Sequence, residues 1–261
     1  MRTLIFAAAI DISAASTQAA SPFHGHWVED LNTQAGQAGH DDYLVANGYY
    51  TCRSCRPPRH YRADGKMRPV PGDVSVISEG VTIAGPRTIV THIIDREMMR
   101  ETTMTVAVDN RTAMYVSVDK WPNYSKRLRT EYLAKRVAPA PGGAHPVSGR
   151  WLGLKYVEGP EEYRSNDFQE ENGLFTRSNF RHGHYTAKIG GPAAPVMGDG
   201  KNIFMAAVRA PDARTRIETI SLKGKPLVER TYHLLADGKS MLTTVRDPQD
   251  GSVYKITSHR T

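Results

Sequence analysis

The chain has 261 residues, of which 39% are apolar, so it is long enough to bury one or two hydrophobic cores and is not a low-complexity sequence. Its formal net charge is +7, but the basic residues are spread along the chain without a Lys/Arg-rich run, which argues against a nucleic-acid-binding protein. No apolar run beyond the N-terminus approaches the roughly 20 residues that span a bilayer, so we expect a soluble mature protein without an integral membrane segment.

Residues 1–20 have the layout of an export signal. Arg2 provides the positive start, residues 4–10 form the apolar run, and residues 17–19 form a small-x-small cleavage site. We therefore expect this segment to be removed as a signal peptide and the mature protein to be periplasmic or secreted.

The rest of the chain reads as one sequence unit used twice. The first copy begins at Trp27 and the second at Trp151, 124 residues later. Residues 47–51 (NGYYT) return as residues 172–176 (NGLFT), and a His-Tyr pair follows in both copies. These pairs are His60 with Tyr61 and His184 with Tyr185. The repetition predicts two similar domains.

The boundary between the copies is marked by composition. Residues 138–147 are rich in Pro and Gly and have no periodicity, which is typical of a linker. This predicts one domain over residues 21–137 and another over residues 148–261.

Both copies carry short runs with a period of two, which is typical of half-buried β-strands. The runs cover residues 88–94, 102–108, 114–118, 216–222, 229–235 and 241–245. Residues 109–111 and 237–239 favour tight hairpin turns between them. The first copy has about five extra residues in its last hairpin, around residues 120–122. Since neither copy has a long amphipathic helix pattern, we expect an all-β fold of two tandem antiparallel barrels.

Each copy starts with Gly-x-Trp and has an Arg after its last strand: Trp27 with Arg136 in the first copy, and Trp151 with Arg260 in the second. This layout resembles the lipocalin or calycin superfamily, in which a Trp on the first strand closes the barrel floor and an Arg stacks on it. The resemblance implies two lipocalin-like barrels, similar to tandem exported lipocalin-like proteins of bacteria. That superfamily includes ligand carriers, haem-binding members and carotenoid hydratase-like enzymes built on two barrels, so the resemblance leaves function open.

Cys52 and Cys55 are the only cysteines. In an oxidising compartment we expect them to form a disulfide within one loop. Two alternatives remain open, a redox-active pair and a metal site that also uses His60. Two His-x-His pairs offer another metal hypothesis, because residues two apart on a strand point to one face. These are His24 with His26 and His182 with His184.

Several motifs of common enzyme classes are missing from the sequence. It has no Gly-x-Ser-x-Gly, no phosphate-cradling Gly loop and no dinucleotide fingerprint. We therefore expect no cofactor, and we expect neither an ordinary serine hydrolase nor a nucleotide-dependent enzyme.

The first function hypothesis is a binding protein that holds a small apolar or amphipathic ligand in a barrel interior or in the cleft between the barrels. Arginines at the barrel rim, among them Arg59 and Arg62, would favour an acidic head group. The ligand contacts predicted from the repeated segment are Tyr49, Tyr50, Arg53, Phe175 and Arg177.

The second hypothesis is a cofactor-independent lyase, hydratase or isomerase. His60 or His184 would act as general base and the neighbouring Tyr61 or Tyr185 as acid. Acidic residues close to them in sequence are Asp41, Asp42, Glu170 and Glu171. A third hypothesis is a scaffold of the cell envelope, whose barrels are filled by their own side chains.

Overall fold

The computed structural model describes residues 21–37, 39–198 and 203–261, so the predicted export signal lies outside the described residues. The described part is almost entirely β, as expected, with twenty strands and one four-residue helix, α1 (Glu161–Arg164). Within these same ranges no helix is long and apolar enough to cross a lipid bilayer.

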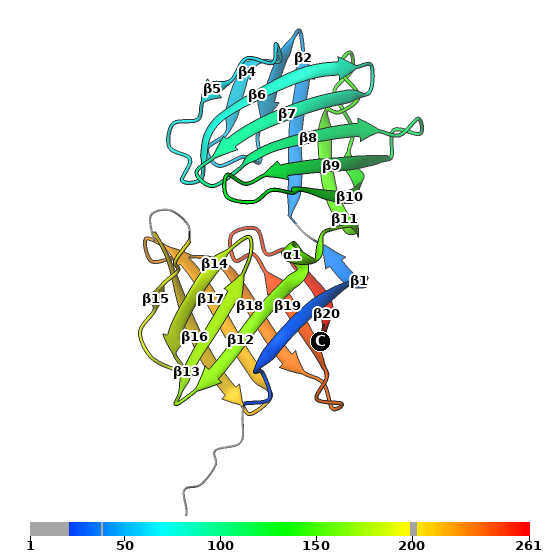
Figure 1. Ribbon diagram of the computed structural model, residues 1–261. Coiled ribbons are helices and arrows are strands. Elements are labelled where there is room, and N and C mark those ends of the chain that lie inside the picture. Colours follow the sequence, from blue (N-terminus) through cyan, green and yellow to red (C-terminus); the bar gives the residue numbers. More distant parts are fainter. Residues whose placement is uncertain (1–20, 38, 199–202) are drawn as a thin grey trace, which may run out of the picture.

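The described strands form two antiparallel ten-stranded sheets, and each sheet curls into a barrel-like body (Figure 1). Barrel I, the upper body, contains in spatial order β4 (Arg59–Arg62), β3 (Tyr49–Cys52), β2 (His40–Ala46), β11 (Gly149–Glu158), β10 (Arg127–Ala138), β9 (Thr112–Lys120), β8 (Met99–Val106), β7 (Thr88–Asp95), β6 (Val76–Gly85) and β5 (Arg68–Pro69). Barrel II, the lower body, contains β14 (Gly183–Lys188), β13 (Leu174–Asn179), β12 (Ser165–Glu171), β1 (Gly25–Gln37), β20 (Val253–Arg260), β19 (Ser240–Arg246), β18 (Lys225–Leu234), β17 (Thr215–Leu222), β16 (Phe204–Asp212) and β15 (Ala194–Pro195).

The two edges of each sheet approach one another. In barrel II the backbone of His184 in β14 exchanges two hydrogen bonds, of 2.9 and 2.7 Å, with Met197, which follows β15. In barrel I Asp64, just after β4, forms a bridge with Thr82 in β6. The predicted pair of tandem antiparallel barrels is therefore confirmed as two curled antiparallel sheets.

The six predicted strands fall on β7, β8, β9, β17, β18 and β19, and the predicted turns lie between β8 and β9 and between β18 and β19. Asn110 and Gly238 in these turns have φ angles of 57° and 65°, a conformation that Asn and Gly tolerate best. The five extra residues of the first copy lengthen a ribbon, since β9 and β10 have nine and twelve residues where β19 and β20 have seven and eight.

The sheets and the sequence copies do not coincide, because the copies exchange their first strands. β1 lies between β12 and β20 of the second copy, and β11 lies between β2 and β10 of the first. Residues 138–147, predicted to link two domains, connect β10 to β11 inside barrel I. This loop is fastened to its own barrel, since the Nε2 of His145 is 2.8 Å from the carbonyl oxygen of Gly85.

The exchange also decides which Trp meets which Arg. The Arg260 guanidinium lies 4.6 Å from the ring centre of Trp27, and that of Arg136 lies 4.2 Å from the ring centre of Trp151. In each pair the two residues stand opposite one another on neighbouring strands. The stacked pairs are therefore formed across the copies, not within them as the sequence suggested, because the last strand of each copy pairs with the first strand of the other.

Both Trp side chains are fully buried, near the start of β1 and of β11. The Nε1 of Trp27 donates to the carbonyl of Phe23 at 2.9 Å, and that of Trp151 donates to the carbonyl of Val147 at 2.8 Å. β1 and β11 run from these ends towards the junction of the two bodies (Figure 1). The opposite ends of the two barrels therefore face one another.

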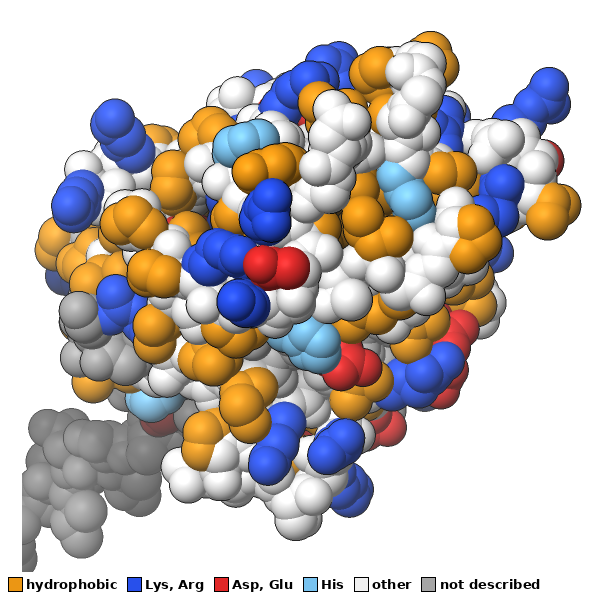
Figure 2. Space-filling view, turned by 90° about the horizontal axis from the view of Figure 1, so that it is seen from above, with side chains coloured by type: hydrophobic (Ala, Val, Ile, Leu, Met, Phe, Trp, Pro, Cys, Tyr) orange, Lys and Arg blue, Asp and Glu red, His pale blue; other side chains and the backbone are white. Residues whose placement is uncertain are grey.

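The Lys and Arg side chains on the face shown in Figure 2 do not gather into one positively charged patch. Lys and Arg side chains on this face are spread among apolar and neutral ones. A continuous basic stripe of the kind that follows a nucleic-acid backbone is not seen on this face.

Candidate functional site

An aromatic cluster joins the facing ends of the two barrels. Trp121, in the loop after β9, packs edge-on against Phe180 of barrel II with ring centroids 5.2 Å apart. The Nε1 of Trp121 donates to the hydroxyl of Tyr163 in α1 at 2.8 Å, and this hydroxyl donates to the buried Asp119 at 2.6 Å. The extra residues of the first copy therefore contribute one of the contacts between the barrels.

A cavity of about 450 Å³ lies at this junction, and we call it the junction cavity. It is bounded by the turns before β6 and between β7 and β8 of barrel I, and by β17, β18 and the β13–β14 turn of barrel II. Its apolar walls include Val76, Ile93, Met98, Val196, Ile220 and Val228. Its charged walls hold Arg96, Arg100, Arg177, Arg181 and Arg230 together with Asp95 and Glu97. Its volume lies within the usual range of small-molecule sites.

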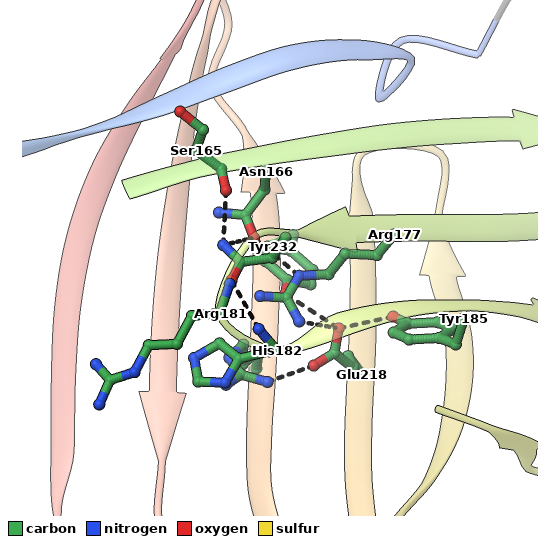
Figure 3. A network of polar contacts seen from close by, with 10 residues as sticks. Ser165, Asn166, Arg177, Arg181, His182, Tyr185, Glu218 and Tyr232 are labelled. Carbon is green, nitrogen blue, oxygen red and sulfur yellow. Dashed lines mark hydrogen bonds and ion pairs between the residues drawn. The ribbon is translucent and has the colours of Figure 1, made fainter. Parts of the chain in front are cut away.

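A polar network lies inside barrel II next to this cavity (Figure 3). Its centre is Glu218 of β17, which is fully buried. The carboxylate accepts hydrogen bonds from Tyr185 at 2.6 Å and from Tyr232 at 3.1 Å. It also pairs with Arg230, and with Arg177 at 3.5 Å. Alternate residues of β17 point inwards, which explains how a Glu within a β-branched run faces the core.

The charges of this network shift the pKa values of its members. Burial alone would raise the pKa of Glu218, but Arg177 and Arg230 outweigh it and hold this pKa below its ordinary value. Burial and the Glu218 charge raise the pKa of Tyr185 well above 10. Glu218 is therefore an anion at neutral pH. Its single negative charge faces the two positive charges of Arg177 and Arg230, so one positive charge is left over.

A second, smaller cavity of about 110 Å³ lies at the end of barrel II that faces the junction, where Thr130 and Tyr156 of barrel I also line it, and we call it the inner cavity. Glu29 and Leu31 of β1 line it, and both share a strand face with the buried Trp27. Among the described residues the Glu29 carboxylate forms no hydrogen bond or ion pair, although its main-chain oxygen accepts from Arg164 at 2.7 Å. Burial raises the pKa of Glu29 from 4.5 to about 7 against the opposing charges of Arg177 and Arg230.

His182, in the β13–β14 turn, lines both cavities. The residue is exposed to the solvent in these cavities, and desolvation by neighbouring protein atoms together with the charges of Arg230, Arg181 and Arg177 lowers the pKa of its imidazole below 6.5. A neutral imidazole among arginines can accept or donate a hydrogen bond without adding to the positive charge.

The interior of barrel I is different, because tyrosine rings fill it. Tyr115 stacks on Tyr132 with ring centroids 4.4 Å apart, and the Tyr132 hydroxyl donates to Asp41 at 3.1 Å. Tyr50 packs between Tyr43 and Tyr61 at 5.7 Å from each. The interior of barrel I around these rings is therefore occupied by its own aromatic side chains.

The proposed His-Tyr pairs do not converge. His60 lies on the outside of barrel I, where its Nδ1 contacts Thr51 at 2.8 Å and its ring stacks on Tyr49 at 5.3 Å. Tyr61, the next residue of the same strand, packs inwards. His184 is likewise exposed, whereas Tyr185 is buried against Glu218. Adjacent residues of a strand point to opposite faces, so neither pair can act on one substrate atom.

The acidic residues near these histidines in sequence have other partners. Asp42 pairs with Arg53 at 3.5 Å and with Arg150 at 3.6 Å on the surface, and Asp41 lies in the tyrosine cluster. Glu170 pairs with Arg216 at 2.6 Å, while Glu171 is exposed. None of these contacts involves His60 or His184.

The predicted ligand contacts are divided between inside and outside. Tyr50, Phe175 and Arg177 are buried in the barrels, whereas Tyr49 and Arg53 are exposed. Of these five residues, only Arg177 lines the junction and inner cavities. The two further rim arginines also separate, since Arg59 is buried with Glu79 and Asp73 and Arg62 lies outside against Tyr49.

The cysteines form the expected disulfide, Cys52–Cys55. Both sulfurs are thus bonded to each other, which leaves no thiolate for a metal site with His60. Of the His-x-His pairs, His26 pairs with Asp167 at 2.7 Å on the outer face of β1, and His182 lies in the cavities while His184 lies on the outside. Across the described ranges no group of three His, Cys, Asp or Glu side chains is placed to hold a metal ion.

Glu29, Glu218 and Arg230 were not singled out by sequence reasoning. A signal for Glu29 was present, because it stands two residues after Trp27 and period two places it on the face of the barrel plug. The same rule puts Glu218 on the inner face with Ile220. What period two cannot show is that Arg177 and Arg230, on other strands, lie next to these carboxylates.

No protein-family model, no curated protein and no solved structure matches this chain.

Proposed function

We propose that the protein binds a small amphipathic molecule with an anionic head group, and that the junction cavity is its site. The observation that carries the proposal is a cavity of about 450 Å³ with apolar walls and five arginines. Apolar walls with a few charged groups at one end suit a ligand that has an apolar tail and a charged head.

The sign of the head group follows from the charges. Asp119 neutralises Arg100 through two contacts of 2.7 Å. In the described part of the chain, Glu218 is the one carboxylate that pairs with Arg177 and with Arg230. Among the described residues Arg181 forms no ion pair, and its guanidinium lies 5.4 Å from the ring centre of Tyr163. Uncompensated guanidinium charge beside an enclosed space favours an anion.

The test uses decanoate as probe and isothermal titration calorimetry of the mature chain. Decanoate is expected to bind, and decylamine, which has the same tail and the opposite charge, is not. Octanoate should bind about ten-fold more weakly, since each buried methylene contributes about 0.8 kcal/mol. Binding of decylamine as tight as that of decanoate, or no binding of either, would overturn the proposal.

Two matched variants locate the site. Arg181→Gln should weaken decanoate binding about ten-fold or more, because a hydrogen bond to a charged group contributes roughly 1.5–3 kcal/mol. Arg209→Gln, which removes an arginine that is 63% exposed on the outer surface, should leave the affinity unchanged. Equal effects of both variants would place the anion elsewhere.

Lipocalin-like ancestry and an extracytoplasmic location belong to the same proposal. The stacked pairs Trp27–Arg260 and Trp151–Arg136 support the first, because they reproduce the barrel-floor contact of that superfamily. The Cys52–Cys55 disulfide supports the second, because such bonds persist mainly in oxidising compartments.

A further inference from the structure

We propose that the anionic head group of the ligand enters the inner cavity of barrel II and that one proton enters with it, onto the carboxylate of Glu29. This inference rests on the proposed function, because it assigns the position and the ionisation of the head group of the same ligand. It makes Glu29 a residue that determines which ligands bind and at what pH.

The junction cavity and the inner cavity are connected. Arg177, Arg181, His182 and Arg230 line the junction cavity and the inner cavity alike, so the two spaces adjoin at these side chains. The inner cavity, at about 110 Å³, has room for about four water molecules, each of which takes up about 30 Å³ in the liquid. That room suits a carboxylate group and excludes a long apolar tail, which must remain in the junction cavity.

Four arginines surround the inner cavity. Arg164 of α1, Arg177 of β13, Arg181 of the following turn and Arg230 of β18 all line it. Arg164 donates to the main-chain oxygens of Gly159 and Glu29, at 3.0 and 2.7 Å, and no carboxylate among the described residues pairs with it. The cavity is thus built to attract an anion, and Glu29 is the one carboxyl group on its described walls.

The carboxyl group of Glu29 would repel an entering carboxylate if both were ionised. If Glu29 is ionised, an entering carboxylate meets a second negative charge in a space with little water, and like charges in such a space favour sharing a proton. If Glu29 is protonated, its hydroxyl can donate a hydrogen bond to the entering carboxylate. Because burial raises the pKa of Glu29 to about 7, protonation near neutral pH is easily reached.

Every other titratable group that faces the inner cavity keeps one ionisation state between pH 6 and 8. The four arginines remain charged, and the low pKa of His182 keeps its ring neutral. The remaining groups are the phenols of Tyr156, Tyr163, Tyr232 and Tyr254. Phenols ionise near pH 10, and burial raises the pKa of Tyr254 to about 12. Proton uptake in this pH range therefore reports on Glu29.

The experiment measures the protons taken up with decanoate. Calorimetric titrations of the mature protein are made at pH 6 in MES and in Bis-Tris, and at pH 8 in HEPES and in Tris, since the different ionisation enthalpies of the two buffers at each pH give the number of protons bound per ligand. With a pKa of about 7, Glu29 should take up about 0.9 proton at pH 8 and about 0.1 at pH 6, and the affinity should be about ten-fold weaker at pH 8. Uptake near zero at pH 8, with decanoate bound, would overturn the inference.

Glu29→Gln separates the carboxyl group of the protein from that of the ligand. This variant should bind decanoate with no proton uptake and equal affinity at both pH values, whereas Glu171→Gln, on the exposed side of β12, should behave like the unchanged protein. Uptake that persists in Glu29→Gln would mean that the ligand enters as the neutral acid, which also overturns the inference. Should Glu29→Gln not fold, as judged by circular dichroism, the buffer comparison on the unchanged protein decides alone. Failure of the proposed function looks different, since decanoate would then not bind at either pH.

Discussion

Glu218→Gln is the substitution that tests the buried network most directly. It keeps the size of the side chain and one carbonyl oxygen for the hydroxyls of Tyr185 and Tyr232, but it removes the one carboxylate among the described residues that pairs with Arg177 and Arg230. The NH2 group of the new Gln side chain is a hydrogen-bond donor, and it would face guanidinium groups that are also donors, so the two cannot pair. The variant therefore leaves two buried cations without the carboxylate that they contact directly.

The expected loss of stability is large. Removing one partner of a buried ion pair costs about 3–5 kcal/mol, since the other partner stays buried and unpaired. For a protein of this size 1 kcal/mol corresponds to about 2–4 °C, so the melting temperature should fall by about 10 °C. Glu229→Gln on β18 is the matched control, because the 3.5 Å pair of Glu229 with Arg209 is exposed. Such pairs contribute about 1 kcal/mol or less.

The measurement is urea unfolding at pH 7, followed by circular dichroism and by tryptophan fluorescence, with a repeat at pH 3. Because the pKa of Glu218 is lowered in the folded protein, its contribution is present above pH 4.5 and is lost as the pH falls through the folded-state pKa. The difference between the unchanged protein and Glu218→Gln should thus shrink at pH 3. A difference below about 1 kcal/mol at pH 7, or one that stays the same at pH 3, would refute this account of the network.

Two further predictions concern the strand exchange and the pH dependence of stability. A protease site can be inserted between Gly142 and Gly143, where no other atom lies close. After cleavage there, the two fragments should co-elute in size-exclusion chromatography and separate only in denaturant, because each fragment supplies a strand to the barrel of the other. Fragments that separate without denaturant would contradict the exchange. Since the folded state raises the pKa of Glu29 from 4.5 to about 7, stability should fall as the pH rises between these values, and Glu29→Gln should be more stable than the unchanged protein at pH 8, by at most about 3 kcal/mol, with little difference at pH 4. Equal unfolding midpoints of the two proteins at pH 8 would show that the Glu29 carboxylate is well solvated.

Local patterns sufficed for the elements because they depend on neighbours in the chain. A period of two over residues 88–94 and 216–222 needs only the alternation of a strand, and β7 and β17 appear there. Asn110 and Gly238 form the expected turns for the same reason, since the tolerance of Asn and Gly for positive φ angles depends on the residue type and not on distant contacts. The disulfide Cys52–Cys55 also follows from short separation along the chain.

The candidate site could be predicted only in part, for a reason that the His-Tyr pairs illustrate. His60 with Tyr61 recurs as His184 with Tyr185, and this recurrence fits either a functional pair or a duplicated element of the core. In a strand, however, neighbours point to opposite faces, and this rule, already used for the His-x-His pairs, separates each His from its Tyr. Arg177 was the one predicted ligand contact that lies in both cavities, because period two and the position after Phe175 place it inside the barrel.

Strand pairing between distant segments was decided by the tertiary structure alone. Both copies begin with a similar strand, so β1 and β11 can pair equally well with either half as far as side-chain pattern is concerned. The structure places β1 in barrel II and β11 in barrel I, and this exchange brings Trp27 to Arg260 and Glu29 to Arg177 and Arg230. The amino-acid sequence by itself determined two β-rich units with a Trp and an Arg at their ends, since these follow from local alternation and turn chemistry. Which unit each first strand completes, and therefore which charges share the interior of barrel II, depends on contacts between residues more than a hundred positions apart in the chain.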